Sequence, residues 1–376
     1  METKGALAKL LLDRRVILTL GAGGVGKTTS SAAMACLGAM LGKKVALLSI
    51  DPAKRLADAM GIRLGSELSR IRFPTDLEVK GSLYGAMLDQ KAVFDEMVTK
   101  WAKSPKAQER IFSNKIYQSV SANMGGPLEY MALAKLQAIV EDDSFDLIVV
   151  DTPPDTHALD FLDRPNALSG FMEKGVMTWL IKPFALAQKL GAGKLLRAGG
   201  RMMSGIAAVT GVKMLQLLAE FLILIEDVIQ GFGEAGKKVM TLMRSQQAAF
   251  VLVAAPHDAA QRSSNTLMKE LAKQGYDLSF LIVNRLLDEG LLSELASSKK
   301  HSDLDAGLAR LPQSDLEVLQ VKSYNIKDNL QCLQDLRRQV FPSSSMVGLV
   351  EQHGAIHTLD ALNSFAQSLA AAEVME

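Results

Sequence analysis

The sequence Val16-Ile17-Leu18-Thr19-Leu20-Gly21-Ala22-Gly23-Gly24-Val25-Gly26-Lys27-Thr28-Thr29 decides the fold. Its first five residues form a continuous apolar run, which is typical of a parallel strand buried on both faces. The next residues satisfy the pattern Gly-x-x-x-x-Gly-Lys-Thr, and an alanine-rich helical pattern continues to about Leu41, before Gly42. A strand, a glycine turn and a helix in this order predict a phosphate-binding loop. The alternative is a glycine-rich turn with an incidental lysine, and the flanking strand and helix argue against it.

The residue types in this turn predict a nucleoside triphosphate as the ligand. Glycines let the backbone N–H groups turn toward phosphate oxygens, and the amino terminus of the following helix adds partial positive charge. We expect Lys27 to bridge the β- and γ-phosphates as a catalytic residue and Thr28 to ligate Mg²⁺. We therefore predict that ATP or ADP binds with Mg²⁺ to Gly23, Gly24, Val25, Gly26, Lys27, Thr28 and Thr29.

The composition describes a folded chain with no large charge imbalance. Of 376 residues, 48% are apolar and 22% are charged, which excludes a disordered or fibrous protein. A net charge of +1 argues against a protein that coats nucleic acid, and no nucleic-acid partner is expected. The two cysteines are too few for a disulfide framework, which fits a reducing cytoplasm.

The amino-terminal residues 1–9 carry both acids and bases, so no signal peptide is predicted. The longest apolar stretches are 202–212 and 221–225, and both are shorter than the roughly 18 residues that a membrane span needs. We expect a cytoplasmic protein, and peripheral contact with a membrane stays open.

Four further apolar runs resemble the strand before the phosphate loop, at 45–50, 146–150, 250–254 and 280–283. A helical pattern from about Ala259 to Lys273 separates the last two. Strands that alternate with helices predict a doubly wound, mostly parallel α/β sheet of a phosphate-loop NTPase. Ligands of such sheets bind at the carboxyl ends of the strands, where Gly21, Asp51, Asp151 and Asn284 fall.

Two aspartates follow predicted strands and are candidates for the metal and the attacking water. Asp151 ends the run 147–150, the position from which a carboxylate reaches Mg²⁺ through a water molecule. The alternative, a helix-capping aspartate, is less favoured beside a phosphate loop. Asp51 ends the strand that we expect to neighbour the loop, and its carboxylate could orient and deprotonate the attacking water as a catalytic residue. Since Asp51-Pro52 is also a simple turn signal, both interpretations stay open.

Two stretches without strand signals, 86–140 and 166–243, are predicted to form a discontinuous helical insertion. Residues 1–85, 141–165 and 244–376 then form the ATPase domain. The insertion holds eleven of the eighteen methionines: Met87, Met97, Met124, Met131, Met172, Met177, Met202, Met203, Met214, Met240 and Met243. After Asn284 the pattern is polar and helical to about Val340. A last strand at 346–350, a loop at 351–354 and a closing helix to about Ala370 complete the prediction.

The motifs together resemble the family of the arsenite-pump ATPase (ArsA) and the tail-anchored-protein targeting ATPases, within the dimeric MinD-like phosphate-loop ATPases. The resemblance spans most of the chain and is weakest between 285 and 345. It rests on Gly-x-Gly-Gly-Val-Gly-Lys-Thr-Thr at 21–29, Asp-Pro-Ala at 51–53, Asp-Thr-Pro-Pro at 151–154 with His157 and Phe161-Leu162, and Val-Asn-Arg at 283–285.

This resemblance implies a dimer with two nucleotides near its interface. Residues 51–58 resemble the first switch of the family, with Asp51 activating water, and 151–162 resemble the second. Asn284 matches the residue whose amide reads the adenine edge. The loop 351–354, with Gln352, would wrap the base, although Glu351 replaces the proline that is usual there. We favour a packing role for His157.

The chain departs from the family in two motifs. Ala22 occupies the position of the lysine that reaches the partner's phosphates in family dimers, and such a cation can be worth about 10³ to 10⁵ in rate. Lys54, Arg55 or a lysine of a paralogous subunit could replace it, so either a homodimer or a heterodimer is expected. The family's zinc-binding Cys-x-x-Cys is also missing after Asn284, and no zinc is expected. The arsenite site's cysteine cluster has no counterpart either.

The helical insertion is expected to carry the partner site. Leu218, Phe221, Leu222, Ile225, Ile229 and Phe232 share one helix face, and Leu217, Ile223 and Leu224 widen it. Such a helix is buried or faces a hydrophobic client, and both stay open. Seven bases against one acid within 171–213 leave open a membrane contact or a solvated face.

We favour an ATP-hydrolysing dimeric switch that targets or chaperones hydrophobic protein segments, such as tail-anchored clients. A MinD-like partitioning ATPase is the first alternative. The helix around 359–369 nearly lacks Lys and Arg, which argues against that alternative. An energising subunit of an anion pump is a weaker alternative.

Overall fold

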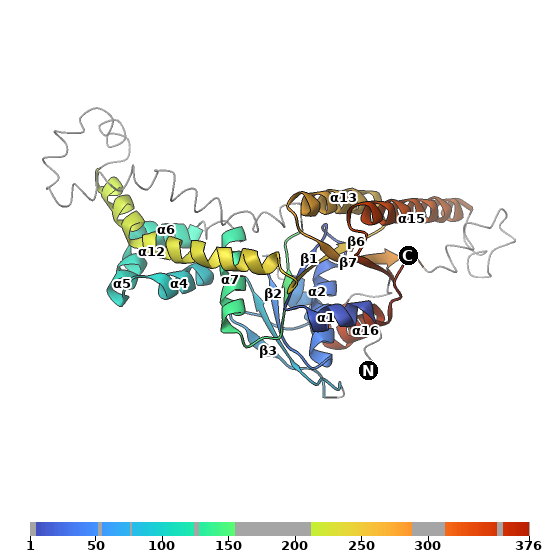
Figure 1. Ribbon diagram of the computed structural model, residues 1–376, viewed down its shortest axis with the longest axis horizontal. Helices are drawn as coiled ribbons and strands as arrows, with labels where there is room; N and C mark the ends of the chain where they lie inside the picture. Colours follow the sequence, from blue (N-terminus) through green and yellow to red (C-terminus); the bar gives the residue numbers. More distant parts are fainter. Residues whose placement is uncertain are drawn as a thin grey trace, which may run out of the picture. The chain divides into compact units, whose positions relative to one another are not determined.

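The computed structural model describes residues 5–51, 55–75, 77–123, 128–154, 212–287, 313–351 and 356–375. The chain forms two compact units (Figure 1). The first comprises Met1–Met87, Asp142–Leu159 and Leu242–Glu376, and the second comprises Leu88–Glu141 and Asp160–Thr241.

The first unit contains one eight-stranded sheet in the order β3-β4-β2-β5-β1-β6-β7-β8. All neighbouring strands run parallel except the edge pair β3 and β4, so the predicted doubly wound α/β fold is confirmed. The strands are β1 (Val16–Leu20), β2 (Lys44–Ser49), β3 (Ser69–Ile71), β4 (Ser82–Met87), β5 (Leu147–Asp151), β6 (Ala248–Ala254), β7 (Leu278–Leu286) and β8 (Ser345–Val350).

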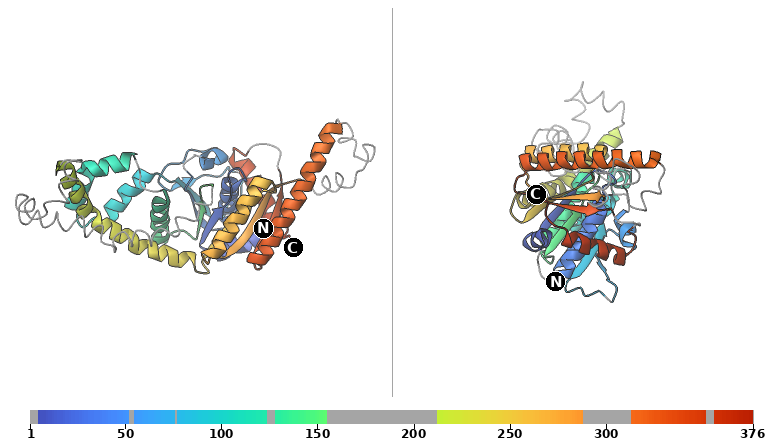
Figure 2. Two further views of the ribbon diagram at one scale, coloured as in Figure 1. Left: turned by 90° about the horizontal axis from the view of Figure 1, so that it is seen from above. Right: turned by 90° about the vertical axis from the view of Figure 1, so that its right-hand side faces the viewer.

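Helices cover both faces of this sheet, as its continuous apolar strands require. On one side, α2 (Lys27–Met40) packs against β1, β2 and β5 and against α1 (Ala6–Asp13), α3 (Arg55–Met60) and α16 (Leu359–Ala371). On the other side, α13 (Asp258–Lys273) packs against β6 and α15 (Gln313–Val340) (Figures 1 and 2). Every residue of β1, β5 and β6 is buried, which explains why these strands carry almost no polar side chains.

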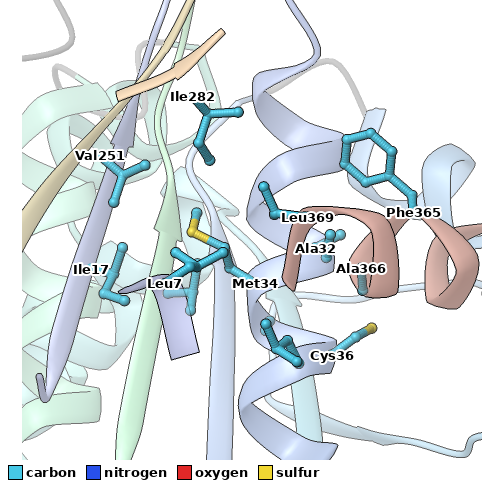
Figure 3. Packing of buried hydrophobic residues seen from close by; sticks show 14 of the residues in the cluster. Leu7, Ile17, Ala32, Met34, Cys36, Val251, Ile282, Phe365, Ala366 and Leu369 are labelled. Carbon is cyan, nitrogen blue, oxygen red and sulfur yellow. The ribbon is translucent and has the colours of Figure 1, made fainter. Parts of the chain in front are cut away.

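The core between α2, α16 and the sheet fixes the helix that carries the phosphate loop. Met34 of α2 points toward Ile17 of β1, while Leu369 and Ala366 of α16 pack on the opposite side of α2 (Figure 3). All four side chains are almost completely shielded from solvent. Burial of a side chain of this size contributes about 1.5–3 kcal/mol, so α2 is held firmly against the strand that precedes it.

Three details of the sheet differ from the sequence-based expectation. The predicted helical stretch began at Ala86, but Ala86 and Met87 end the missed strand β4. This strand is short and interrupted by Gly85, which obscured its alternation. The strand that carries Asp51 does not neighbour the loop strand, because β5 lies between β2 and β1. Asn284 lies within β7, which continues to Leu286, and not at its end.

The described residues of the second unit form the helices α4 (Gln90–Trp101), α5 (Pro105–Ser113), α6 (Lys115–Asn123) and most of α7 (Leu128–Asp142) and α12 (Val212–Met243). Helix α12 buries one face at alternating intervals of three and four residues, as a helix packed along its length does. That face consists of Phe221, Ile225, Val228, Phe232, Ala235 and Val239.

Two contacts show what α12 packs against. Phe232 meets Trp101 of α4 edge to face, with ring centroids 6.4 Å apart, and Gly231 leaves room for the same indole ring. Near the other end of the helix, Arg110 Nη2 of α5 donates to Glu220 Oε1 at 2.5 Å. Glu220 is therefore paired and only half-exposed. Among the described residues no helix combines the length and the hydropathy needed to cross a bilayer.

The two cysteines should differ sharply in reactivity. Cys36 lies in the core of α2, and burial raises the pKa of its thiol to about 12, whereas Cys332 is exposed. Because only the thiolate attacks a disulfide reagent, a raised pKa keeps Cys36 protonated and inert at pH 8. We expect native protein to release one equivalent of thionitrobenzoate from Ellman's reagent at pH 8 and two equivalents in guanidinium chloride. Rapid release of two equivalents from native protein would contradict this packing.

Candidate nucleotide-binding site

The backbone of the phosphate loop has a conformation that glycine adopts more readily than other residues. Gly24 and Gly26 have φ angles of 79° and 91°, in the left-handed region that other residues avoid. At Gly26 there is also no room for a side chain, because a Cβ atom would overlap the amide of Asn284. Gly26 immediately precedes Lys27, the first residue of α2. The N–H groups of the loop therefore lie at the amino terminus of a buried helix.

The carboxylate of Asp151 is the centre of the site. It is fully buried at the end of β5, the strand directly beside β1. Thr28 Oγ1 donates to Asp151 Oδ2 at 2.9 Å, and the hydroxyls of Ser31 and Ser49 lie 3.2 Å from Oδ1 and Oδ2 respectively. Sequence reasoning missed Ser31 and Ser49, although each lies on an element that it had predicted. These hydroxyl contacts argue against the alternative of a helix-capping aspartate.

Lys27 pairs with this carboxylate. Its ammonium lies 3.2 Å from Asp151 Oδ1 and also donates to the carbonyl oxygen of Thr152. Both side chains of the pair are almost completely buried. A buried charge is tolerated only when it is paired, so each of these two groups stabilises the other. A phosphate bound at the loop would compete with Asp151 for this ammonium, which would tie ligand binding to the carboxylate.

The second aspartate, Asp51, lies beside the first. Strands β2 and β5 are neighbours, and the N–H of Ile50 donates to the carbonyl of Asp151 at 2.8 Å. Asp51 is buried, and Arg55 Nη1 of α3 donates to Asp51 Oδ2 at 3.3 Å. Arg55 is itself 54% exposed. The two carboxylates thus come from adjacent strand ends. Arg55, which the sequence offered as a substitute for the lysine missing at position 22, contacts the predicted water-activating carboxylate of its own chain.

Asn284 joins the phosphate loop to a neighbouring cavity. Its Nδ2 donates to the carbonyl of Val25 at 3.0 Å, and the side chain is buried. The cavity has a volume of about 480 Å³, within the range of small-molecule sites. Its walls include Gly26, Thr29, Asn284, Arg285, Glu351 and His357. The structure therefore brings Gly26 and Thr29 of the loop together with the predicted base-reading residue.

The oxygen donors present fit Mg²⁺. Hydroxyl and carboxylate oxygens are the ligands that this hard cation prefers, and Thr28 and Asp151 supply one of each 2.9 Å apart. Among the described residues no group of three His, Cys, Asp or Glu side chains gathers into another metal site. The remaining predicted positions Gln352, Lys54, His157 and the second switch beyond Pro154 lie outside the described residues, and so do residues 171–211 of the basic stretch.

A buried strand, a left-handed glycine turn, a helix and a carboxylate on the adjacent strand define a phosphate-loop ATPase. Residues 14–305 match the family model described as anion-transporting ATPase. The chain belongs to this ATPase family, and the resemblance found in its motifs is confirmed. It is accordingly an ATP-hydrolysing enzyme.

Three similar proteins are also named as ATPases. The protein named ATPase GET3 from Podospora anserina is 26% identical over 285 residues, covering 74% of this chain and 75% of that protein. ATPase ASNA1 homolog 1 from Paramecium tetraurelia is 26% identical over 271 residues, covering 71% and 73%. ATPase get3 from Aspergillus terreus is 28% identical over 274 residues, covering 73% of each chain.

The Lys27 and Asp151 pair should behave as a coupled unit in the absence of nucleotide. Lys27→Ala leaves the buried carboxylate without its cation, and we expect it to lower the free energy of unfolding by about 3–5 kcal/mol. Adding Asp151→Asn removes the stranded charge, so the double variant should regain a large part of that loss. Urea unfolding of both single variants and the double variant measures the coupling. Additive effects of the two substitutions would show that the ion pair is energetically unimportant.

Proposed function

We propose that this ATPase is a Mg²⁺-dependent dimeric switch that binds and targets hydrophobic protein segments through its helical second unit. The observation that carries the enzymatic part is the meeting of the phosphate loop, Asp151 and Asp51 at adjacent strand ends. The likeness to proteins named ATPase GET3 and the apolar helix α12 support the targeting part.

The loop and Lys27 bind the triphosphate. Backbone N–H groups from Gly23 to Thr29 surround the phosphate oxygens, and the amino terminus of α2 adds its dipole. Lys27 leaves Asp151 and contacts the β- and γ-phosphates. Thr28 would hold Mg²⁺ directly and Asp151 through water, and the ion would neutralise charge on the phosphates.

Asp51 activates the attacking water. Its carboxylate accepts the proton of the water as the water oxygen attacks the γ-phosphorus, and the bond to the β,γ-bridging oxygen breaks to release ADP. Burial limits the competition from bulk solvent at this carboxylate. Arg55 holds the carboxylate at 3.3 Å and orients it from the first turn of α3.

A change at the nucleotide site would reach the second unit through the polypeptide that connects the two units. Asp151 and Thr152 contact Lys27, and the second unit resumes at Asp160. When Lys27 exchanges Asp151 for a phosphate, the contacts that anchor residues 151 and 152 change. We propose that this change sets the exposure of the client surface and the state of the dimer, whether of like or of paralogous subunits.

Helix α12 supplies an apolar surface beyond the face that it buries. Leu222, Ile223, Leu224 and Ile229 are only half-buried, although all four are large and apolar. Partly exposed aliphatic side chains on one helix suit an apolar helical client. The MinD-like alternative receives less support, because α16 contains no lysine or arginine with which to contact an anionic membrane.

Asp51→Asn should separate binding from hydrolysis. The amide cannot accept the proton of the water, and we expect the ATPase rate to fall by about 10²-fold or more while the Kd for ATP changes less than about threefold. Steady-state phosphate release and calorimetric titration measure the two quantities. Asp277→Asn, a change at an exposed carboxylate of the same unit, is the matched control and should hydrolyse normally. A variant with undiminished turnover would remove Asp51 from the mechanism.

A charged residue on α12 should weaken client binding. We expect Ile223→Asp to reduce the affinity for a fluorescent peptide with one hydrophobic helix by roughly tenfold, because the carboxylate would lose water on binding. Gln230→Asp places the same charge at an exposed position of the same helix and is the control. Fluorescence anisotropy in the Asp51→Asn background, with ATP and with ADP, measures both. Equal binding by the two variants, or no nucleotide dependence, would argue against client binding by this surface.

A further inference from the structure

A threonine interrupts the apolar strand that leads to the phosphate loop. β1 otherwise contains only valine, isoleucine and leucine, and Thr19 is fully buried within it. In the parallel pairing of β1 with β5, Thr19 lies opposite Asp151. Burial of a hydroxyl is unfavourable unless it is hydrogen-bonded, so the partners of Thr19 show why the strand tolerates it.

The partners of Thr19 form a chain that ends at Asp151. Thr19 Oγ1 lies 2.7 Å from the carbonyl oxygen of Val150 and 2.6 Å from Ser31 Oγ. Ser31 is also fully buried, and its Oγ lies 2.9 Å from the carbonyl oxygen of Lys27 and 3.2 Å from Asp151 Oδ1. Two buried hydroxyls therefore connect β1 to the carboxylate at the centre of the site.

The number of hydrogens limits which of these contacts can be hydrogen bonds at one time. Each hydroxyl carries one hydrogen, and two hydroxyl oxygens 2.6 Å apart must share one between them. If Ser31 donates to Thr19, then Thr19 donates to the carbonyl of Val150. Ser31 then has no hydrogen left for Asp151. If Thr19 donates to Ser31 instead, the hydrogen of Ser31 is available to Asp151 Oδ1, so only this direction supplies a donor to the carboxylate.

The departure of Lys27 would change what the carboxylate needs. The Lys27 ammonium lies 3.2 Å from Asp151 Oδ1, whereas the hydroxyls of Thr28 and Ser49 contact the other oxygen, Oδ2. In the proposed mechanism the ammonium moves to the phosphates. Among the described side chains, Ser31 is then the one that still contacts Oδ1. A buried carboxylate oxygen without a donor is unfavourable, so the second direction of the hydroxyl chain is favoured in that state.

We propose that Thr19 and Ser31 are positioning residues for Asp151, and that hydrogen donation between them reverses when Lys27 moves to the phosphates. Ser31 then donates to Asp151 Oδ1 in place of Lys27 and holds the carboxylate with Oδ2 toward Thr28. This inference rests on the proposed nucleotide site and assigns it two further residues. Groups that orient the ligands of a metal commonly change metal affinity or activity by about 10- to 100-fold when they are removed.

The test measures the Kd of ATP by calorimetry with and without Mg²⁺. We expect Ser31→Ala to raise the Kd with Mg²⁺ by roughly tenfold, because Asp151 Oδ1 loses its remaining donor. Without Mg²⁺ nothing replaces the charge of Lys27 beside Asp151, so the Kd should change less than about twofold. Thr19→Val keeps the branched shape but lacks the hydroxyl, and it should raise the Kd with Mg²⁺ by roughly threefold. Thr19→Ser keeps the hydroxyl and should bind as wild type does.

The effects of the two substitutions should not add. If Thr19 acts on Asp151 through Ser31, the double variant Thr19→Val/Ser31→Ala should lose no more affinity than Ser31→Ala alone. Ser30→Ala is the matched control, because Ser30 is an equally buried residue of α2 whose hydroxyl has no hydrogen-bond partner among the described residues. Urea unfolding without nucleotide checks that each variant is folded. If Ser31→Ala does not fold, the comparison of Thr19→Val with Thr19→Ser tests the proposal alone.

Equal weakening with and without Mg²⁺, or no change in any variant, would overturn the roles of Thr19 and Ser31 while leaving the nucleotide site intact. An equal loss in Thr19→Val and Thr19→Ser would show that packing, and not the hydroxyl, matters at this position. Additive losses in the double variant would remove the connection between the two hydroxyls. Failure of wild-type protein to bind ATP with Mg²⁺ would instead refute the proposed nucleotide site.

Discussion

The buried carboxylate of Asp151 is the constraint on which the site depends. A fully buried charge at a strand end is unfavourable unless every side of it is satisfied, and here Lys27, Thr28, Ser31 and Ser49 surround it. Three of these residues come from α2 and one from β2. The carboxylate therefore connects the loop helix to two strands of the sheet. The same oxygens that hold the fold together are those that can hold Mg²⁺.

In the proposed mechanism, Lys27 contributes both to the stability of the site and to its function. In the structure Lys27 neutralises Asp151, whereas the proposed mechanism places its charge at the phosphates. A ligand that draws Lys27 away must replace its positive charge near Asp151, and Mg²⁺ bound with the triphosphate would do so. Nucleotide and metal are thereby expected to bind together. Because Lys27 also contacts Thr152, the proposed exchange would extend to the segment that leads into the second unit.

Much of the fold and of the loop could be predicted from the sequence because their signals are local. The apolar run at 16–20, the glycine turn and Asp151 each belong to a short stretch, and the structure places them as expected, whereas the strand that leads to Asp51 lies one strand further from the loop. The order of the strands could not be predicted in the same way, since nothing local in β5 specifies that it inserts between β1 and β2. The edge strand β3 and its neighbour β4 escaped notice because β3 has only three residues and Gly85 interrupts β4.

The site residues that were missed are those whose role depends on tertiary contacts. Ser31 and Ser49 are ordinary helix and strand residues in the sequence, and only the packing of α2 on the sheet brings them to Asp151. The hydrogen bond from Asn284 to the carbonyl of Val25 likewise joins residues 259 positions apart. Glu351 was noticed as a departure from the family, and only the structure places it in the wall of the cavity beside the loop.

Titration of ATP into wild-type and Asp151→Asn protein, with and without Mg²⁺, measures whether Asp151 links the metal to the triphosphate. We expect Mg²⁺ to strengthen ATP binding markedly in wild-type protein and to have little effect in Asp151→Asn. The same Mg²⁺ dependence in both proteins, or no ATP binding by the wild type, would show that Asp151 does not provide this link.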